Sequence, residues 1–553
     1  MNKRVVIVGG VAGGMSAAAR LRRLDEQAHI IVFERGGHVS FANCGLPYFL
    51  GGEITEFNKL LVQTPGRLKE VFNLDVRVRS EVIRIDRAAR EVEVRDLSSG
   101  RVYREGYDAL ILATGAAPLT PPLPGLDRPG HFTLRNLDDT SNIHAWVGNQ
   151  TARRAVVIGA GFIGLEMAEQ FRHRGLEVTL VERLPQVLAP LDAEMVGPIH
   201  EELRHHGIDL HLGDSVQRFD DPPAGVLASE VVLASGKRLP ADVVILGLGV
   251  RPESKLAKEA GLDLSERGAI KVDEHLRTSD PAIWAVGDAV EVTDPITGNK
   301  GVVPLAGPAN RQGRIAADNI AGRPSTYHGT LGTAIVRVFG LTAAVTGANA
   351  RTLTQAGIPF QVVHLHPGSH AGYYPGAKPI HLKVLFAPKT GKLLGAQAVG
   401  ADGVDKRIDI LATVLHHGGT VHDLAELELA YAPPFGSAKD PVNLAGMAAQ
   451  NILAGDVQVA RWDEVAGLIQ SGAALLDVRE PAERAGGFIP ESQHIPLGQL
   501  RGRLSELDRS REWLVYCASG QRSYIACRLL SQHGFRCRNL TGAYRTWRAA
   551  SAS

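Results

Sequence analysis

The chain has 553 residues, too many for one hydrophobic core, so several domains are expected. A net charge of +1 excludes the strongly basic or acidic surface of proteins that bind nucleic acids or anionic membranes. Four cysteines exclude a disulfide framework and indicate a reducing compartment, the cytoplasm. We expect no membrane span, since no apolar run approaches ~18 residues, and no metal site, since no Cys/His cluster has suitable spacing.

The first 34 residues carry the pattern of a βαβ dinucleotide-binding unit. Val5–Val8 is a continuous apolar run, which predicts a strand buried on both faces. A glycine-rich turn follows it, and an alanine-rich helix is predicted over Met15–Leu24. A second strand, His29–Phe33, leads to Glu34, whose carboxylate can accept hydrogen bonds from ribose hydroxyls. The pattern departs from GxGxxG at Val11, where the middle glycine usually lies.

A second copy of the pattern begins near residue 155. A strand over 155–158 leads into Gly-Ala-Gly-Phe-Ile-Gly, then a helix and a second strand that ends at Glu182. A carboxylate at this place favours the free 2′-hydroxyl of NADH and repels the 2′-phosphate of NADPH. Arg183 opposes that preference, so NADPH is the less favoured cofactor. Two such units in one chain predict two dinucleotides, FAD in the first and NADH in the second.

Two further segments complete a flavin-binding pattern. Residues 109–116 form a strand that ends in Thr-Gly, and 283–289 form one that ends in Gly-Asp. Either segment alone fits an ordinary buried strand and turn. Together with the two glycine-turn units, however, the two segments occur in the same order as in the flavin disulfide reductase family, which this chain therefore resembles. That resemblance implies that Asp288 binds the flavin's ribityl chain. The cofactor-binding residues expected are Gly9, Gly10, Ala12, Gly13, Gly14, Glu34, Arg35, Thr114, Gly115, Asp288, Gly159, Gly161, Gly164, Glu182 and Gly249.

The stretch Ser40–Tyr48 holds Cys44, the only cysteine in the first 516 residues. A buried structural cysteine is the alternative interpretation, but its place just after a nucleotide-binding strand favours redox chemistry. Phe49 stands where the CxxxxC class has its second cysteine, so Cys44 must cycle through a mixed disulfide, a persulfide or a sulfenic acid. Ala12 stands where the peroxide- and oxygen-reducing relatives have a histidine, so peroxide chemistry lacks its proton-handling group. We expect a flavin, backbone amides and bound cation groups to lower the pKa of Cys44 below about 8.5.

A smaller α/β unit follows a short linker, expected at 454–461. Its strands, predicted at 474–479 and 513–516, and its helix at 524–533 resemble a rhodanese domain. The six residues after Cys517 are expected to form a loop whose amides stabilise a thiolate or persulfide, with Arg522 adding positive charge. Cys527 and Cys537 are interpreted as packed. The loop residues are Ala518, Ser519, Gly520, Gln521 and Arg522.

The whole chain is similar to coenzyme A disulfide reductases fused to a rhodanese domain. That resemblance implies a homodimer in which tyrosines of one subunit approach the reactive sulfur of the other. Interface packing is the alternative for the tyrosines, and a solvated helix face for the arginines. The catalytic residues so implied are Cys44, Cys517, Tyr373 and Tyr431, and the coenzyme A contacts are Arg20, Arg23, Ser40, Asn43 and Lys439.

We therefore expect an α/β protein with two Rossmann-like domains, an α+β dimerisation domain and a C-terminal rhodanese domain. The expected boundaries are 1–115 and 250–328 for FAD, 116–249 for NADH, 329–455 for dimerisation and 456–553 for the rhodanese domain. The expected function is NADH-driven reduction of coenzyme A persulfides, polysulfides or disulfides, with coenzyme A as cofactor or substrate and Cys517 as persulfide carrier. The alternatives are an NADH oxidase and a sulfur-carrier or sensor protein that uses Cys517. Small sulfur compounds are the expected partners, with no nucleic acid and no membrane.

Overall fold

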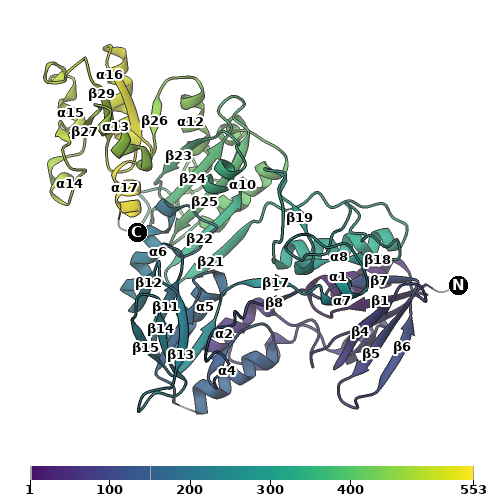
Figure 1. The fold of residues 1–553 in the computed structure, drawn as a ribbon. Helices are drawn as coiled ribbons and strands as arrows, with labels where there is room; N and C mark the ends of the chain where they lie inside the picture. Colours follow the sequence, from purple (N-terminus) through teal and green to yellow (C-terminus); the bar gives the residue numbers. More distant parts are fainter. Residues whose placement is uncertain (1–2, 150, 552–553) are drawn as a thin grey trace. The chain divides into compact units, whose positions relative to one another are not determined.

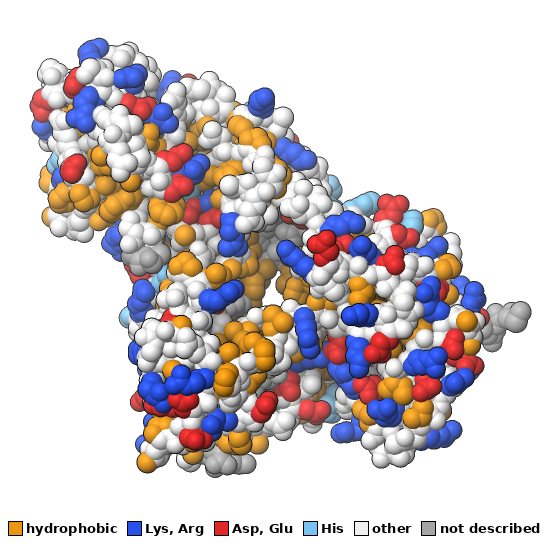
Figure 2. Space-filling view, in the orientation of Figure 1, with side chains coloured by type: hydrophobic (Ala, Val, Ile, Leu, Met, Phe, Trp, Pro, Cys, Tyr) orange, Lys and Arg blue, Asp and Glu red, His pale blue; other side chains and the backbone are white. Residues whose placement is uncertain are grey.

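The computed structural model describes residues 3–149 and 151–551. The chain forms two compact units, shown along the ribbon in Figure 1. The nucleotide unit comprises residues 1–183 and 207–332, and the C-terminal unit comprises 184–206 and 333–553. On the face seen in Figure 2, acidic and basic side chains are interspersed, in keeping with the net charge of +1. Among the described residues, no helix is both long enough and apolar enough to span a bilayer.

The nucleotide unit is built on a parallel five-stranded sheet in which every strand except the short edge strand Asp75–Arg77 is almost wholly buried. Helix α1 (Ala12–Leu24) packs against helix α8 (Ala306–Ile320) over this sheet. A Cβ on Gly313 would lie 2.2 Å from the carbonyl oxygen of Gly13, so the two helices can approach this closely only at glycine. In sheet order the strands are β18 (Ile283–Ala285), β7 (Ala109–Leu112), β1 (Arg4–Val8), β2 (His29–Phe33) and β3 (Asp75–Arg77).

A second parallel sheet in the same unit repeats this arrangement. Helix α5 (Phe162–His173) follows its central strand as α1 follows β1. The strands are β12 (Ile208–Leu212), β11 (Glu177–Glu182), β10 (Arg154–Ile158), β16 (Val243–Leu246) and β9 (His131–Phe132). The two dinucleotide-binding units expected from the glycine patterns are therefore present as folded copies.

The C-terminal unit begins with an antiparallel sheet in the order β21-β22-β25-β24-β23. Strand β25 (Leu393–Gly400) is buried at every residue, because helices α10 (Val404–His416) and α12 (Pro441–Leu453) cover the domain. Helix α6 (Ala193–His205) belongs to the same unit: buried Lys383 binds Asp192 at 2.6 Å and also pairs with Glu194. The other strands are β21 (Ala334–Val338), β22 (Leu341–Gly347), β23 (Gln361–Leu365) and β24 (Ile380–Phe386).

The last domain of the C-terminal unit is a parallel sheet in the order β26-β30-β29-β27-β28, in yellow-green in Figure 1. Its helices include α14 (Pro481–Ala485), α16 (Gln521–Gln532) and α17 (Ala543–Ser551). The prediction that residues 454–461 form a linker is wrong in part. Gln458–Ala460 forms β26, which pairs with β30 (Arg536–Leu540) at the sheet edge. The other strands are β27 (Ala474–Asp477), β28 (Gln493–His494) and β29 (Glu512–Tyr516). The predicted fold class is confirmed.

Candidate active sites

The first glycine turn lies at the carboxyl edge of the first sheet. Gly9 has φ +106°, and a Cβ there would lie 2.1 Å from the carbonyl oxygen of Ala113. A Cβ on Gly14 would lie 1.9 Å from the carbonyl oxygen of Gly9, so the turn requires glycine at both ends. Glu34 accepts hydrogen bonds from the amides of Gly10 at 2.8 Å and Gly36 at 2.7 Å. The turn and its carboxylate thus form a cradle that fits a dinucleotide.

The second glycine turn has the same construction. Gly159 has φ +98°, and a Cβ on Gly164 would lie 1.8 Å from the carbonyl oxygen of Gly159. Glu182 accepts the amide of Ala160 at 2.8 Å, as Glu34 does in the first copy. The carboxylate is therefore fixed beside the turn, and Gly161 is the N-cap of α5.

Helix α1 begins at Ala12, three residues earlier than the predicted Met15. Gly13 and Gly14 are poor helix formers, which is why the pattern predicted a later start. The early start places the helix N-terminus, with its unpaired amides, inside the turn.

Further residues predicted for the first cofactor lie along the same edge. Thr114 donates its hydroxyl to the carbonyl of Glu253 at 2.6 Å, and Arg35 pairs with the Glu253 carboxylate at 3.3 Å. Burial raises the pKa of Asp288, and the charge of Arg135 opposes that shift. Asp288 lies in the short helical turn Gly287–Ala289, which follows β18.

Cys44 is tied to both nucleotide-binding folds. Its segment begins with the amide of Ser40 donating to the carbonyl of Gly10 at 2.8 Å, and Ser40 has a left-handed φ of 49°. The following helix, α2 (Leu46–Gly51), packs on α5, and Tyr48 donates to Glu166 of α5 at 3.2 Å. Cys44 and Asn43 are exposed on this segment. The thiol therefore lies between the first glycine turn and the helix of the second.

The groups of the chain itself raise the pKa of Cys44, apart from the contributions expected of a flavin and bound cations. Partial removal of water from the sulfur raises the pKa, and the carboxylates of Glu166 and Asp288 raise it further, against a smaller lowering by a backbone hydrogen bond. Activation of this thiol must therefore come from a bound molecule.

The two arginines predicted to hold coenzyme A differ in their surroundings. Arg20 is paired with Asp318 of α8 at 2.7 Å, and both side chains are mostly buried. Arg23 is exposed. The sequence could not distinguish them, because the partner of Arg20 lies almost 300 residues away.

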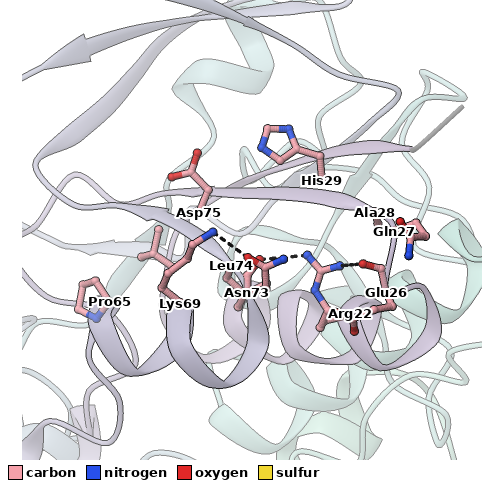
Figure 3. Close-up of a pocket in the computed structure, with 11 residues that line it drawn as sticks. Arg22, Glu26, Gln27, Ala28, His29, Pro65, Lys69, Asn73, Leu74 and Asp75 are labelled. Atoms are coloured by element: carbon pink, nitrogen blue, oxygen red, sulfur yellow. Dashed lines mark hydrogen bonds between the residues drawn. The ribbon is translucent and has the colours of Figure 1, made fainter.

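A hollow of about 610 Å³ lies at the opposite edge of the first sheet, where the strands begin (Figure 3). Arg22 lies in its wall with its guanidinium bound to the carbonyls of Glu26 and Asn73, and Lys69 binds the Asn73 side chain. Its cations are thus engaged by the protein, and it is distant from the glycine turn along the strands.

Tyr373 and Tyr431 lie together in the C-terminal unit. Their hydroxyl groups are 2.8 Å apart, and Tyr373 is 77% exposed. The hydrogen bond between the two hydroxyl groups raises the pKa of Tyr373. Two loops far apart in sequence therefore present one exposed pair of phenols. Lys439 is exposed further along the second loop.

Arg407 holds these two loops together, a role the sequence analysis missed. Its guanidinium is 1% exposed; it donates to the carbonyl of Ser369 at 2.9 Å and pairs with Asp440 at 2.9 Å. The amide of Ala371 also donates to the carbonyl of Gly436 at 2.9 Å. In the sequence Arg407 is one of several charged residues in a helix, with no signal that sets it apart.

The second thiol, Cys517, directly follows strand β29 and is fully buried. The amide of Gly520 donates to its sulfur at 3.1 Å and the hydroxyl of Ser523 at 3.4 Å. Gly520 has φ +110° and turns the chain directly into α16. Neutral donors thus converge on the sulfur, as expected for a persulfide-stabilising loop.

The predicted six-residue loop is too long. Helix α16 begins at Gln521, so the loop spans Ala518–Gly520 and Arg522 belongs to the first helical turn. The guanidinium of Arg522 forms two 2.6 Å hydrogen bonds to Glu483 of α14. The charge expected to face the sulfur is therefore already paired. Cys527 is buried in the core of the same domain, and Cys537 donates to its carbonyl at 3.4 Å.

One group of metal-binding side chain types gathers among the described residues. Ligand atoms of Glu53, Glu169 and His173 lie within 4.8 Å of one another, and Gln170 donates to Glu53 at 2.9 Å. Glu169 and His173 are one helical turn apart on α5, a spacing visible in the sequence, but Glu53 joins them only through the fold.

Comparison with known proteins gives three family matches. A model described as pyridine nucleotide-disulphide oxidoreductase matches residues 3–313. One described as the dimerisation domain of that family matches 333–441, and one described as a rhodanese-like domain matches 461–550.

Individual relatives extend these matches. A coenzyme A disulfide reductase of Staphylococcus epidermidis is 38% identical over 451 residues, 81% of this chain and 100% of that protein. A structure described as reduced CoADR-RHD from Bacillus anthracis is 48% identical with a TM-score of 0.97, covering 100% of this chain and 98% of that one. A NAD-dependent persulfide reductase from A. fulgidus is 38% identical with a TM-score of 0.91 and coverage of 98% and 100%. A water-forming NADH oxidase from Lactobacillus brevis is 28% identical with a TM-score of 0.78, over 82% of this chain and 99% of that one.

Proposed function

Because the chain belongs to the pyridine nucleotide-disulphide oxidoreductase family, we propose that it is an FAD-dependent reductase that uses NADH to reduce coenzyme A disulfides, persulfides or polysulfides. The observation that carries the proposal is the placement of Cys44, on a segment bonded to the first glycine turn and packed on the helix of the second. The NADH oxidase alternative is supported by a more distant likeness, 28% identical over 82% of this chain.

Each of the two glycine turns, with its carboxylate, would bind one of the two cofactors. The first glycine turn, Glu34 and Asp288 would hold FAD, and the second turn with Glu182 would hold NADH in preference to NADPH. When bound, the nicotinamide and the flavin supply the electron pair that reduces sulfur. Glu182, already fixed by the amide of Ala160, would repel a 2′-phosphate.

Cys44 is the proposed nucleophile. Its thiolate would attack CoA–S–S–CoA to give Cys44–S–S–CoA and release one CoA thiolate, which takes up a proton. With CoA–S–SH, attack on the inner sulfur gives the same mixed disulfide and releases HS⁻. Two electrons then cleave the mixed disulfide and return Cys44 to its starting state.

The tyrosine pair is the proposed proton donor. We propose a homodimer in which Tyr373 and Tyr431 of one subunit approach Cys44 of the other. The raised pKa of Tyr373 keeps its phenol protonated, so it can donate a proton to a leaving thiolate but serves poorly as a base. Phe435, 72% exposed on the same loop as Tyr431, adds apolar surface for a partner.

Coenzyme A would lie along the Cys44 segment. Ser40 and Asn43 flank the thiol, and Lys439 would come from the second subunit. Of the two arginines, exposed Arg23 is available for a phosphate as it stands, whereas Arg20 must share its charge with Asp318.

Cys517 is the proposed sulfur carrier. Its buried thiolate would accept the outer sulfur of a donor and hold it as a persulfide under the Gly520 amide, for delivery to coenzyme A or directly to Cys44. The free thiols of both sites require a reducing compartment, so we place the protein in the cytoplasm.

The test is anaerobic NADH consumption and sulfide release on coenzyme A persulfide, polysulfide and coenzyme A disulfide, for the unmodified chain, Cys44→Ser and Cys517→Ser. We expect Cys44→Ser to lose more than about a thousandfold in turnover of every sulfur substrate while NADH still bleaches the bound flavin. We expect Cys517→Ser to impair persulfide or polysulfide only.

Two outcomes would contradict the proposal. Oxygen-driven NADH consumption that survives Cys44→Ser and exceeds every sulfur activity would favour the oxidase. Negligible NADH consumption on all three sulfur substrates would favour a sulfur-carrier or sensor protein.

A further inference from the structure

The second site contains an ion pair that its proposed chemistry does not use. Arg522 and Glu483 face each other through two hydrogen bonds of 2.6 Å, one from each terminal nitrogen of the guanidinium to each carboxylate oxygen. About a third of each side chain is exposed, 33% for Arg522 and 36% for Glu483. A two-point arginine–carboxylate pair of this kind is strong and geometrically specific.

This pair offsets the positive charge beside the sulfur site. Arg522 is the only lysine or arginine between Cys517 and Ser523, and it lies close enough to feel the charge of a Cys517 thiolate. The groups that touch the sulfur directly, the Gly520 amide and the Ser523 hydroxyl, are neutral.

Two other arginines of the domain are paired in the same way. Arg479 and Arg484 both bind the buried carboxylate of Asp477, at 2.7 and 3.1 Å. Arg545, whose amide binds the carbonyl of Ala518 at 3.1 Å, is exposed. The Gly520 amide and the Ser523 hydroxyl thus stabilise one negative charge on the sulfur as dipoles. The one guanidinium in the turn that follows Cys517, that of Arg522, is already paired with a carboxylate.

Sulfur donors differ in the charge they bring to such a site. Thiosulfate carries two negative charges: attack of the Cys517 thiolate on its outer sulfur forms Cys517–S–S⁻, breaks the donor's S–S bond and releases sulfite with the electron pair. A persulfide R–S–SH gives the same Cys517–S–S⁻ and releases R–SH, after the leaving thiolate takes the proton. The first reaction needs cationic groups to hold a sulfonate and its dianionic leaving group, whereas the second does not.

We propose that Glu483 determines the sulfur donor of the Cys517 site: by holding Arg522 in an ion pair, it disfavours dianionic donors such as thiosulfate and leaves the site selective for persulfides and polysulfides. The proposal deepens the carrier role of Cys517 and rests on it.

The experiment measures sulfur transfer to cyanide from thiosulfate and from coenzyme A persulfide, in the full-length holoenzyme. Glu483→Gln keeps the shape of the side chain and one hydrogen-bonding oxygen but frees the charge of Arg522. We expect kcat/KM for thiosulfate to rise at least about tenfold, mainly through KM, and to fall back as salt is added. Transfer from coenzyme A persulfide should change by less than about threefold.

Two further variants make the test specific. Glu483→Gln/Arg522→Gln should lose the gain on thiosulfate, because the cation that binds the sulfonate is gone. Glu506→Gln breaks the pair with Arg503, a surface ion pair elsewhere in the same domain, and should alter neither donor.

An equal fall with both donors in Glu483→Gln would mean that the pair only fastens α14 to α16, and the proposal would be wrong. A gain on thiosulfate that persists in the double variant would also overturn it, since Arg545 or another group would then bind the anion. If Cys517→Ser leaves transfer from both donors unchanged, the carrier role itself fails, a result distinguishable from either of these.

Discussion

At the scale of single residues, the charges around Cys44 oppose its proposed chemistry. Partial desolvation and the carboxylates of Glu166 and Asp288 all stabilise the neutral thiol, so its pKa is raised. A raised pKa means that less thiolate is present at neutral pH and that reactivity falls as the pH is lowered. While the site is empty, the same carboxylates keep the thiol protonated and so protect it from oxidation.

Replacing Glu166 by Gln should lower the pKa of Cys44, because one of the two negative charges beside the thiolate is removed. The measurement is the pH dependence of Cys44 alkylation by iodoacetamide in the Cys517→Ser background. Its midpoint should move to lower pH. Tyr48→Phe is the matched control, since it removes the hydrogen bond to Glu166 but leaves the charge, and its midpoint should not fall. An unmoved midpoint in Glu166→Gln would show that desolvation alone sets the pKa.

At the scale of elements, helix α17 connects the sulfur-transfer loop to the rest of the C-terminal unit. The amide of Tyr544, in its first turn, donates to the carbonyl of Cys517 at 3.1 Å. The other end of the helix packs on α6, where a Cβ on Gly197 would lie 2.7 Å from the carbonyl oxygen of Ala549. In the middle of the helix, the Thr546 hydroxyl forms a hydrogen bond of 2.9 Å with Nε2 of His366. The position of the Cys517 loop therefore depends on how closely α17 approaches α6.

Gly197→Ala should loosen this contact. We expect the free energy of unfolding of the C-terminal unit to fall by about 1–3 kcal/mol, because the added methyl group meets backbone atoms. Cys517-dependent sulfur transfer should fall as well, while reduction of bound flavin by NADH is unchanged. Urea unfolding and the transfer assay measure the two effects.

Gly467→Ala is the control for that experiment. Gly467 also lies in a helix of the C-terminal unit, α13 (Val465–Gln470), but a Cβ there would meet open space. The substitution should stabilise by about 0.5–1 kcal/mol, as alanine does in an unobstructed helix. Similar stability changes in both variants would show that the α6–α17 approach carries no packing constraint.

At the scale of the whole molecule, the proposed site is divided between two subunits. The phenol pair is held in one geometry by buried Arg407, yet it is exposed and lies in a different unit from Cys44. In a two-fold dimer every contact between the chains is formed twice, so an approach of Tyr373 and Tyr431 to Cys44 of the other chain would give two equivalent active sites.

Mixing two inactive variants tests this arrangement. Cys44→Ser and the double variant Tyr373→Phe/Tyr431→Phe should each have little activity alone. After unfolding and refolding together, half the dimers are hybrids with one intact site each, so activity on coenzyme A disulfide should recover to about a quarter of the unmodified level. No recovery, with hybrid dimers demonstrated by differently tagged chains, would mean that the tyrosines act on the thiol of their own subunit.

Much of this protein follows from local sequence. The strand–glycine–helix patterns at residues 5–34 and 155–182 predict both nucleotide-binding folds, because tight turns and buried strands impose residue types at fixed short spacing. The lone cysteine after Phe33, and Phe49 in place of a second cysteine, determine the class of sulfur chemistry for the same reason.

Only the tertiary structure decided what surrounds those residues. Asp318 pairs with Arg20, Glu483 with Arg522, and Glu166 lies beside Cys44, and each partner is far away in sequence. The strand β26 was hidden because an edge strand of three residues carries too little periodicity to be recognised. Local patterns determine turns, strands and helices, whereas the charge state of a reactive group depends on neighbours that only the packed chain brings within a few ångströms.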